Sequence, residues 1–342
     1  MIIFSVKKKA IIIIAVVAVG AGALCFASGY FIANAYSYQQ TKQIISSIVP
    51  VRENNFNYKF IYPLLSYNLS QALPFLEDTT LSASLDQYIQ SQYKSNTADL
   101  IGVYYRNLLN NRWAGVNEDA QFHPGSMMKV IIMMAYYRKS QVDPTVLQKS
   151  LIYSTQVSEI LAKQTFATPT DLIIGQSYST TYLIQKMIED SDNGAETLLL
   201  YNVDRTILNN AYTDLNLKVP DETPNYTISA REYSAFLRVL YNATYLSEVN
   251  SETALSIMAK SSYHDGIFAG VPSSVVVSQK YGEYVDLDAS GHISDLELNN
   301  CGIVYAKTPY VICIMTKGSN QKTLAPIIKE LSSIIYSYAS NH

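Results

Sequence analysis

At 342 residues, the chain has room for one large domain, or for two ordinary ones, together with a tail. Its apolar share is 48% and only 15% of its residues are charged, a balance that excludes a largely disordered protein and permits a sizeable core. The net charge is −3, with no long basic run beyond the N-terminus, so nucleic acid is not an expected partner.

The N-terminal segment has the features of a membrane anchor. Three lysines at 7–9 precede an uncharged, largely apolar run from Ala10 to about Ala35, a length that crosses a bilayer as a helix. We therefore expect a cytoplasmic basic tail at 1–9, a single transmembrane signal-anchor at 10–35, and a cell-membrane protein whose remaining chain is extracytoplasmic. The competing interpretation is cleavage near Ala35, before Tyr36, which would release a secreted protein.

Residues 36–79 are predicted to form a stalk that leads into a folded domain at 80–342. From Thr80 onward, Leu81, Leu85 and Ile89 recur at helical spacing and predict the first helix of this domain, with Ser or Thr near its start as a cap. Two strand-like runs at 99–105 and 112–116 then surround an Asn-Asn turn and predict a β-hairpin.

The rest of the domain is predicted to be mostly helical before it returns to strands. Helices are expected at 144–152, 157–163, 180–190, 194–201 and 230–243, strands at 273–280, 300–306 and 310–315, and an amphipathic helix at 324–338. Strands near both ends with helices between them predict an α+β fold: an antiparallel sheet flanked by helices, with an inserted all-helical lobe. An active site is expected in the crevice between sheet and lobe.

The three cysteines predict neither a disulfide framework nor a metal site. Cys25 lies in the apolar N-terminal run, and Cys301 and Cys313 lie in the last two predicted strands. A two-residue turn at 308–309 would place Cys313 opposite Val304 and the two cysteines on opposite faces, so buried free thiols are expected. The four histidines show no ligand spacing, and no metal or other cofactor is expected.

A serine and a lysine three residues apart, Ser126 and Lys129, stand at the head of an apolar run directly after Pro124 and Gly125. At that spacing the two side chains share a helix face, and N–H groups at the helix start can stabilise an oxyanion. The S-x-x-K spacing occurs three more times, but only this copy has a turn before it and an apolar helix behind it. The pair predicts an activated nucleophile; the alternative is a helix N-cap beside a solvated lysine.

Two tripeptides extend the pattern. A Ser-Asp-Asn sequence at 191–193 lies between two predicted helices, and a Lys-Tyr-Gly sequence at 280–282 ends a predicted strand. Each is weak alone, because such turns and strand ends are common. In the order S-x-x-K, S-D-N and K-x-G, from about residue 80 to the C-terminus, the chain resembles the penicillin-recognising serine hydrolases, the superfamily of class A β-lactamases and penicillin-binding proteins.

The resemblance implies a role for each of these residues. Ser126 is the expected nucleophile, activated by a neutral Lys129 whose pKa is lowered by desolvation and by the second cation, Lys280. Ser191 is expected to relay the proton to the leaving nitrogen, and Asn193 to hydrogen-bond the acyl side chain of the substrate. Lys280 is expected to bind a substrate carboxylate, and Tyr281 and Gly282 are the other expected substrate-binding residues on this strand. The backbone N–H of Glu283 is expected to form the oxyanion hole together with that of Ser126.

Two departures from the family pattern bear on function. Tyr281 stands between Lys280 and Gly282, where the family has Thr or Ser, whose hydroxyl binds the substrate carboxylate. Class A β-lactamases also carry a glutamate in an E-x-x-L-N loop, which activates the deacylating water; the local match here has Tyr212 at that position. Glu222 is the only nearby substitute, and a plain surface-loop acid is the simpler interpretation of it.

Three functions are therefore considered. The first is a membrane-anchored acyl hydrolase resembling class A β-lactamase, which opens and hydrolyses β-lactams through an acyl-Ser126 intermediate. The second is a penicillin-binding D-alanyl-D-alanine peptidase acting on peptidoglycan, which the missing glutamate favours. The third is a non-catalytic wall-binding domain, which Tyr281 favours and the five retained polar site residues oppose. The motifs account for making an acyl-enzyme better than for breaking one.

Overall fold

The computed structural model describes residues 50–53, 58–67, 76–163, 170–220, 226–288, 290 and 293–341. Apart from Tyr67, these residues belong to one compact unit. The predicted basic tail, the signal-anchor and most of the stalk lie outside the described residues. Within the described part, no helix combines the length and the apolar character that crossing a membrane requires.

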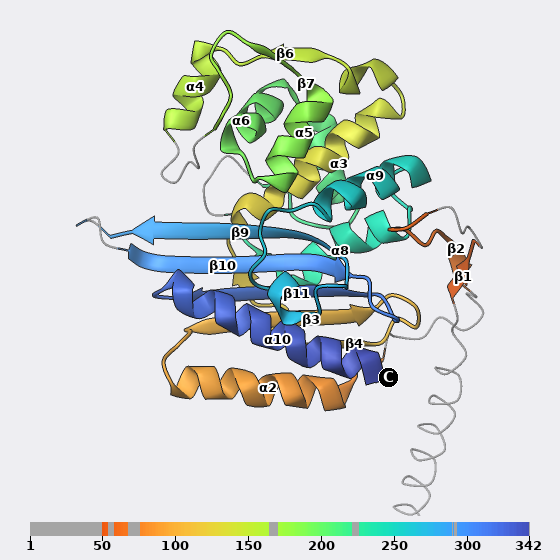
Figure 1. Cartoon of the computed structure of the whole chain (residues 1–342), viewed down its shortest axis with the longest axis vertical. Coiled ribbons are helices and arrows are strands. Elements are labelled where there is room, and N and C mark those ends of the chain that lie inside the picture. The colour runs from red at the N-terminus through yellow and green to blue at the C-terminus, as the bar shows by residue number, and fades with distance from the viewer. Residues whose placement is uncertain are drawn as a thin grey trace, which may run out of the picture. The chain divides into compact units, whose positions relative to one another are not determined.

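The centre of the domain is a five-stranded antiparallel sheet in the order β4-β3-β11-β10-β9 (Figure 1). Side chains alternate between its two faces: in β11, Val311 and Met315 pack into one core, and Ile312 and Ile314 into the other. The predicted α+β architecture is thus confirmed. The strands are β3 (Leu100–Asn107), β4 (Trp113–Val116), β9 (Val277–Leu287), β10 (Ile293–Val304) and β11 (Tyr310–Gly318).

Helices cover both faces of the sheet. The first and last helices of the domain cover one face, and α8 separates the other face from the helical lobe (Figure 1). The first helix is capped by Asp78, whose carboxylate accepts a hydrogen bond from Leu81 N at 3.3 Å, and not by the Ser or Thr that was expected. These helices are α2 (Thr79–Lys94), α10 (Gln321–Asn341) and α8 (Ala230–Tyr241).

The helical lobe contains most of the predicted helices and two that were not predicted, α7 and α9. The helix expected at 144–152 is wrong: a single 3-10 turn, Pro144–Leu147, is followed by strand β6 (Ser150–Ile152), which pairs with β7 (Ser177–Ser179). The remaining lobe helices are α3 (Lys129–Ser140), α4 (Thr155–Ala162), α5 (Thr180–Glu189), α6 (Asn193–Asn202), α7 (Arg205–Thr213) and α9 (Glu248–Met258). Two short pairs complete the described strands, β1 (Pro50–Arg52) with β2 (Leu64–Tyr67) and β5 (Gln121–Phe122) with β8 (Ile228–Ser229).

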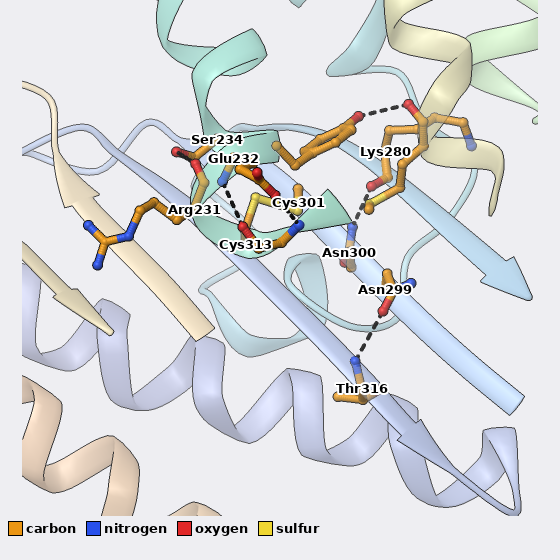
Figure 2. Close-up of a disulfide and its surroundings, with 12 residues drawn as sticks. Arg231, Glu232, Ser234, Lys280, Asn299, Asn300, Cys301, Cys313 and Thr316 are labelled. Carbon is orange, nitrogen blue, oxygen red and sulfur yellow. Dashed lines mark hydrogen bonds between the residues drawn. A yellow bond between two sulfur atoms is a disulfide. The ribbon is translucent and has the colours of Figure 1, made fainter. Parts of the chain in front are cut away.

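The prediction of free thiols is wrong, because Cys301 and Cys313 form a disulfide between β10 and β11 (Figure 2). Five residues, 305–309, connect these strands instead of two, so Val304 pairs with Tyr310 and Cys301 with Cys313. Directly opposed residues share a face, and the two Cα atoms are 4.1 Å apart. On the other side of β10, Cys301 is paired with Lys280 of β9, so the disulfide lies in the same cross-strand row as that lysine.

Candidate active site

Ser126 lies in a 3-10 turn, Gly125–Met128, that runs directly into α3. Gly125 has a φ of +52°, and a Cβ there would overlap the backbone of Glu283. A Cβ at Gly282 would likewise overlap the carbonyl oxygen of Pro124. Because only glycine permits this approach, the turn that carries Ser126 packs directly against strand β9. Strand β9 does not end at Gly282 as predicted but continues through Glu283 to Leu287.

Lys129 is fully buried beside Ser126. Its Nζ donates to Ser126 Oγ at 3.0 Å, to Ser191 O at 2.6 Å and to Ser191 Oγ at 3.2 Å. It also lies 2.5 Å from Asn193 Oδ1. A solvated lysine beside a helix cap is therefore excluded, and the S-x-x-K pair and the Ser-Asp-Asn sequence form one polar cluster.

The Ser-Asp-Asn sequence occupies the break between α5 and α6. Ser191 adopts a left-handed backbone with a φ of +58°, which a non-glycine residue adopts at a cost of about 1–3 kcal/mol. Asp192 then caps α6 by accepting from Ala195 N at 2.7 Å, and it accepts from Thr170 Oγ1 at 2.9 Å. This cap holds the side chains on either side of Asp192, those of Ser191 and Asn193, directed at Lys129.

Lys280 reaches the same cluster from strand β9. Its Nζ donates to Ser191 Oγ at 2.9 Å and to Tyr281 O at 3.2 Å, and it lies 4.3 Å from the centre of the Tyr281 ring. Its side chain is fully buried. Ser191 Oγ therefore accepts hydrogen bonds from both lysines, which joins the strand to the helical side of the site.

Burial dominates the electrostatics of the two lysines. Desolvation lowers the pKa of Lys129, while the nearby carboxylates of Glu196 and Asp192 partly offset this effect. Desolvation holds the pKa of Lys280 well below its usual range, and the positive charge of Lys129 lowers it further. Both environments favour neutral amines, which is the state that Lys129 needs in order to accept a proton.

Glu196 is a member of the cluster that the sequence prediction missed. Its Oε2 lies 3.4 Å from Lys129 Nζ, and its side chain is 18% exposed. It stands in the first turn of α6, three residues after Asn193, so the two side chains share a helix face. The Asn-x-x-Glu spacing in the sequence was the signal that could have identified it. The sequence prediction considered a catalytic glutamate only in the later loop, around Glu222.

Tyr281 packs with its ring against the amine of Lys280. Its ring stacks on that of Tyr263 with 4.1 Å between centres and 16° between planes. Burial raises its pKa, the Glu283 carboxylate adds to the rise, and a hydrogen bond with the Ser191 side chain lowers it. The residue that replaces the family's Thr or Ser thus contacts both Lys280 and Ser191.

Tyr212 does not supply a carboxylate or a substitute for one. It is buried in α7, where its hydroxyl donates to Met128 Sδ at 3.7 Å and its ring packs edge-on against Phe236. Glu222 lies outside the described residues. Among the residues that are described, no group of three or more His, Cys, Asp or Glu side chains is arranged to hold a metal ion.

Solved structures of other proteins share the fold of this chain. The solved structure of PBP-A matches with a TM-score of 0.67 and 19% identity, over 79% of this chain and 100% of that one. A mutant of PBP-A in an acyl-enzyme complex with penicillin G matches with a TM-score of 0.66 and 19% identity, over the same 79% and 100%. A β-lactamase from Francisella tularensis matches with a TM-score of 0.62 and 18% identity, over 76% of this chain and 99% of that one.

These structural likenesses establish the fold. No curated protein sequence matches the chain. The model of the Beta-lactamase enzyme family (Beta-lactamase2) matches residues 82–339, which is more than half of the chain and nearly all of the folded domain. With the serine, the two lysines and the Ser-Asp-Asn turn assembled in one cleft, the chain belongs to the beta-lactamase enzyme family.

Proposed function

We propose that this protein is an active-site-serine acyl hydrolase that opens β-lactams through an acyl-Ser126 intermediate and then hydrolyses that intermediate. The observation that carries the proposal is the buried contact of 3.0 Å between Lys129 Nζ and Ser126 Oγ. A serine hydroxyl is a poor nucleophile unless a neighbour takes its proton. A desolvated lysine at hydrogen-bonding distance can do so, because burial lowers its pKa.

Acylation begins when Lys129 accepts the proton of Ser126 and Oγ attacks the lactam carbonyl carbon. The developing oxyanion is held by the N–H groups of Ser126 and Glu283. The close backbone approach of Gly125 to Glu283 supports this assignment, since it brings the Glu283 backbone next to the turn that carries Ser126. A donor of this kind is typically worth about 3 kcal/mol.

Ring opening then needs a proton on the leaving nitrogen. Ser191 Oγ accepts hydrogen bonds from Lys129 at 3.2 Å and from Lys280 at 2.9 Å, so it can give its own proton to the nitrogen and receive another from Lys129. Asn193 holds the acyl side chain of the substrate. Lys280, whose amine can donate a hydrogen bond in either protonation state, binds the substrate carboxylate beside Tyr281 and Gly282.

A D-alanyl-D-alanine peptidase acting on peptidoglycan is the second candidate. The observation that favours it is Tyr212, an apolar-packed residue at the position where a class A β-lactamase carries its deacylating glutamate. The likeness to PBP-A, one mutant of which forms an acyl-enzyme with penicillin G, is compatible with either activity.

A non-catalytic wall-binding role is the third candidate. Its support is Tyr281, which contacts Lys280 and Ser191 in the part of the cleft where a substrate carboxylate would bind. The polar cluster around Lys129 argues against it, because burying two lysines is costly and a merely structural core has no need of them.

We further propose that the catalytic domain works outside the cytoplasm, held by the N-terminal signal-anchor. The disulfide between Cys301 and Cys313 supports this location, because disulfides persist mainly in oxidising compartments. A fractionation experiment with and without alkaline wash tests it: the intact chain should stay with the membrane, and its domain should be cleaved by protease added to cells stripped of their wall.

The test of the activity is to incubate the full chain with a penicillin and follow its intact mass over time, with Ser126→Ala as the control. A transient adduct of one penicillin supports the β-lactamase, and an adduct that persists for hours supports the peptidase. The Ser126→Ala variant should show no adduct. A folded native chain that forms no adduct at any time would contradict both enzymatic proposals.

A further inference from the structure

A carboxylate stands beside the catalytic cluster in a place that the acylation steps do not use. Glu196 Oε2 lies 3.4 Å from Lys129 Nζ, which in turn lies 3.0 Å from Ser126 Oγ. Because the two contacts share the same nitrogen, Glu196 Oε2 lies no more than 6.4 Å, the sum of the two distances, from Ser126 Oγ, a separation that one bridging water molecule can span. A carboxylate at such a distance is what a deacylating water needs.

We propose that Glu196 is the general base that activates the hydrolytic water and breaks the acyl-Ser126 bond, from helix α6 instead of from the later loop. This inference rests on the proposed function, because it requires the acyl-enzyme. It supplies the step for which the sequence motifs offered no residue.

The position of Glu196 is fixed by the same turn that presents Ser191 and Asn193. The Asp192 carboxylate caps α6, and Asn193 and Glu196 then follow on one face of its first turn. Asn193 Oδ1 lies 2.5 Å from Lys129 Nζ, so the amide and the carboxylate approach the lysine from the same helix. Because α6 is held at its start by this cap, Glu196 is carried by a rigid element and not by a loop.

Water can reach this carboxylate. Glu196 lines a pocket of about 630 Å³ together with Met128, Arg205 and Tyr212. The pocket borders the 3-10 turn at Met128, two residues after Ser126, and the Glu196 side chain keeps 18% of its surface exposed. The pocket therefore gives water access to the Glu196 side chain next to the turn that carries Ser126.

The other nearby carboxylates are less suited to this step. The Asp192 carboxylate is 4% exposed and is occupied by Ala195 N and Thr170 Oγ1. The Glu283 carboxylate is occupied by a hydrogen bond that it accepts from Gln321 Nε2 of helix α10. The charged groups facing Glu196 are Lys129 on α3, Arg205 on α7, Asp192 at the start of α6 and Lys280 on β9.

The step balances with the residues at hand. Glu196 takes a proton from water, and the water oxygen forms a bond to the acyl carbon while that carbon holds its oxyanion. Glu196 then passes this proton across their contact to Lys129, which is neutral after acylation because its own proton went to Ser191. The bond between the carbon and Ser126 Oγ breaks, Oγ takes the proton from the resulting ammonium of Lys129, and the acyl group leaves as a carboxylic acid that ionises in water. Glu196 and Lys129 are thereby both restored.

The substitution that tests the proposal is Glu196→Gln, which keeps the shape and removes the base. In the intact-mass time course with penicillin, we expect its deacylation to slow by about 100-fold or more, so that the adduct accumulates. Acylation should be retained or faster, since the Glu196 charge raises the pKa of Lys129 and its removal leaves more of the neutral amine.

Two matched variants serve as controls. Glu159→Gln changes an exposed acid on α4, and its adduct should have the native lifetime. Glu222→Gln tests the competing loop acid, and its adduct should also turn over normally. If the Glu196→Gln chain does not give the native far-UV circular dichroism spectrum, Glu196→Asp replaces it, and its adduct must outlive the native one for the proposal to stand.

The outcomes separate this inference from the function on which it rests. The proposal is overturned if Glu196→Gln deacylates at the native rate, if Glu222→Gln traps the adduct instead, or if acylation and deacylation fall together, as expected of a residue that only holds Lys129 in place. A native adduct as long-lived as that of Glu196→Gln overturns it as well. A native chain that forms no adduct refutes the acyl-enzyme, and the inference with it.

Discussion

The site has a helical wall, formed by Ser191, Asn193 and Glu196, and a strand wall, formed by Lys280 and Tyr281. The two walls differ in the groups that surround their lysines. On the helical wall, Ser191, Asn193 and Glu196 direct four oxygen atoms at Lys129, all within 3.4 Å of its Nζ, in addition to Ser126 Oγ. On the strand wall, Lys280 lies against the ring of Tyr281 and donates a hydrogen bond to Ser191 Oγ. Both lysines are fully buried, yet only Lys129 has a carboxylate in ion-pair contact among these residues.

This difference divides the chemistry between the walls. Burial, reinforced by the positive charge of Lys129, holds the pKa of Lys280 well below its usual range, whereas the directly paired Glu196 carboxylate offsets part of the effect of burial on the pKa of Lys129. The helical wall is therefore suited to exchanging protons, and the strand wall to selecting the substrate. Substitutions on the helical wall should therefore change proton transfer, and substitutions on the strand wall should change substrate binding.

The largest effect is expected for Lys129→Ala, which removes the base from the helical wall. Acylation by penicillin should slow by about 1,000-fold, within the range for a lost general base. In the native chain the rate should rise with pH through a pKa below the ordinary lysine value of 10.5, because the neutral amine is the active form. That rise should disappear in the variant, as measured by adduct formation across pH.

Lys139→Ala, on the same helix but partly exposed and paired with Asp204, is the control for charge loss and should acylate normally. An unchanged pH profile in Lys129→Ala would show that another group takes the proton. It would contradict the proposal that the helical wall exchanges protons while the strand wall selects the substrate.

A smaller effect is expected on the strand wall for Tyr281→Thr, which restores the hydroxyl that the family pattern carries. Removing the ring from Lys280 opens the cleft to a substrate carboxylate, so acylation by penicillin should become about 10-fold faster, equal to about 1.4 kcal/mol. Deacylation should not change, since Glu196 lies on the other wall. The rates come from the same mass time course.

Tyr281→Phe is the matched variant, because it keeps the ring stacked on Tyr263 and loses only the hydroxyl that contacts Ser191. Its acylation rate should increase less than that of Tyr281→Thr. Slower acylation in both variants would indicate that Tyr281 helps to bind the substrate and does not obstruct it.

The smallest effect on the reaction is expected from the Cys301→Ala/Cys313→Ala double variant. The disulfide closes a loop between residues 12 apart in sequence, and its loss should reduce the free energy of unfolding by about 2–3 kcal/mol. Urea denaturation measures this change. Acylation should stay within about 2-fold of native, because backbone pairing still sets the register of β9 against β10.

Native protein treated with a reductant and then blocked at its thiols provides a comparison without substitution. A 10-fold loss of acylation in either sample would assign the disulfide a part in positioning Lys280, the residue paired with Cys301.

Elements with a strong local signal were predictable from the sequence. Leu81, Leu85 and Ile89 gave the first helix because helical spacing needs no tertiary partner to be recognised, and all three are buried. Elements whose signal depends on neighbours were not: 150–152 became a strand because 177–179 pairs with it. The predicted pairing of the cysteines was wrong because the register of a hairpin depends on the length of its connection. The prediction assumed a two-residue turn, whereas five residues connect the strands.

The site divides in the same way. The sequence by itself determined which residue types were present, because Ser126 with Lys129, the Ser-Asp-Asn turn and Lys280 occur at spacings that the chemistry requires. Only the tertiary structure decided that Lys129 is buried among oxygen atoms, that Tyr281 leans on Lys280, and that Glu196 is the carboxylate in contact with the base. Burial and distance between side chains from different elements set pKa values and proton paths, and neither quantity is encoded in local spacing.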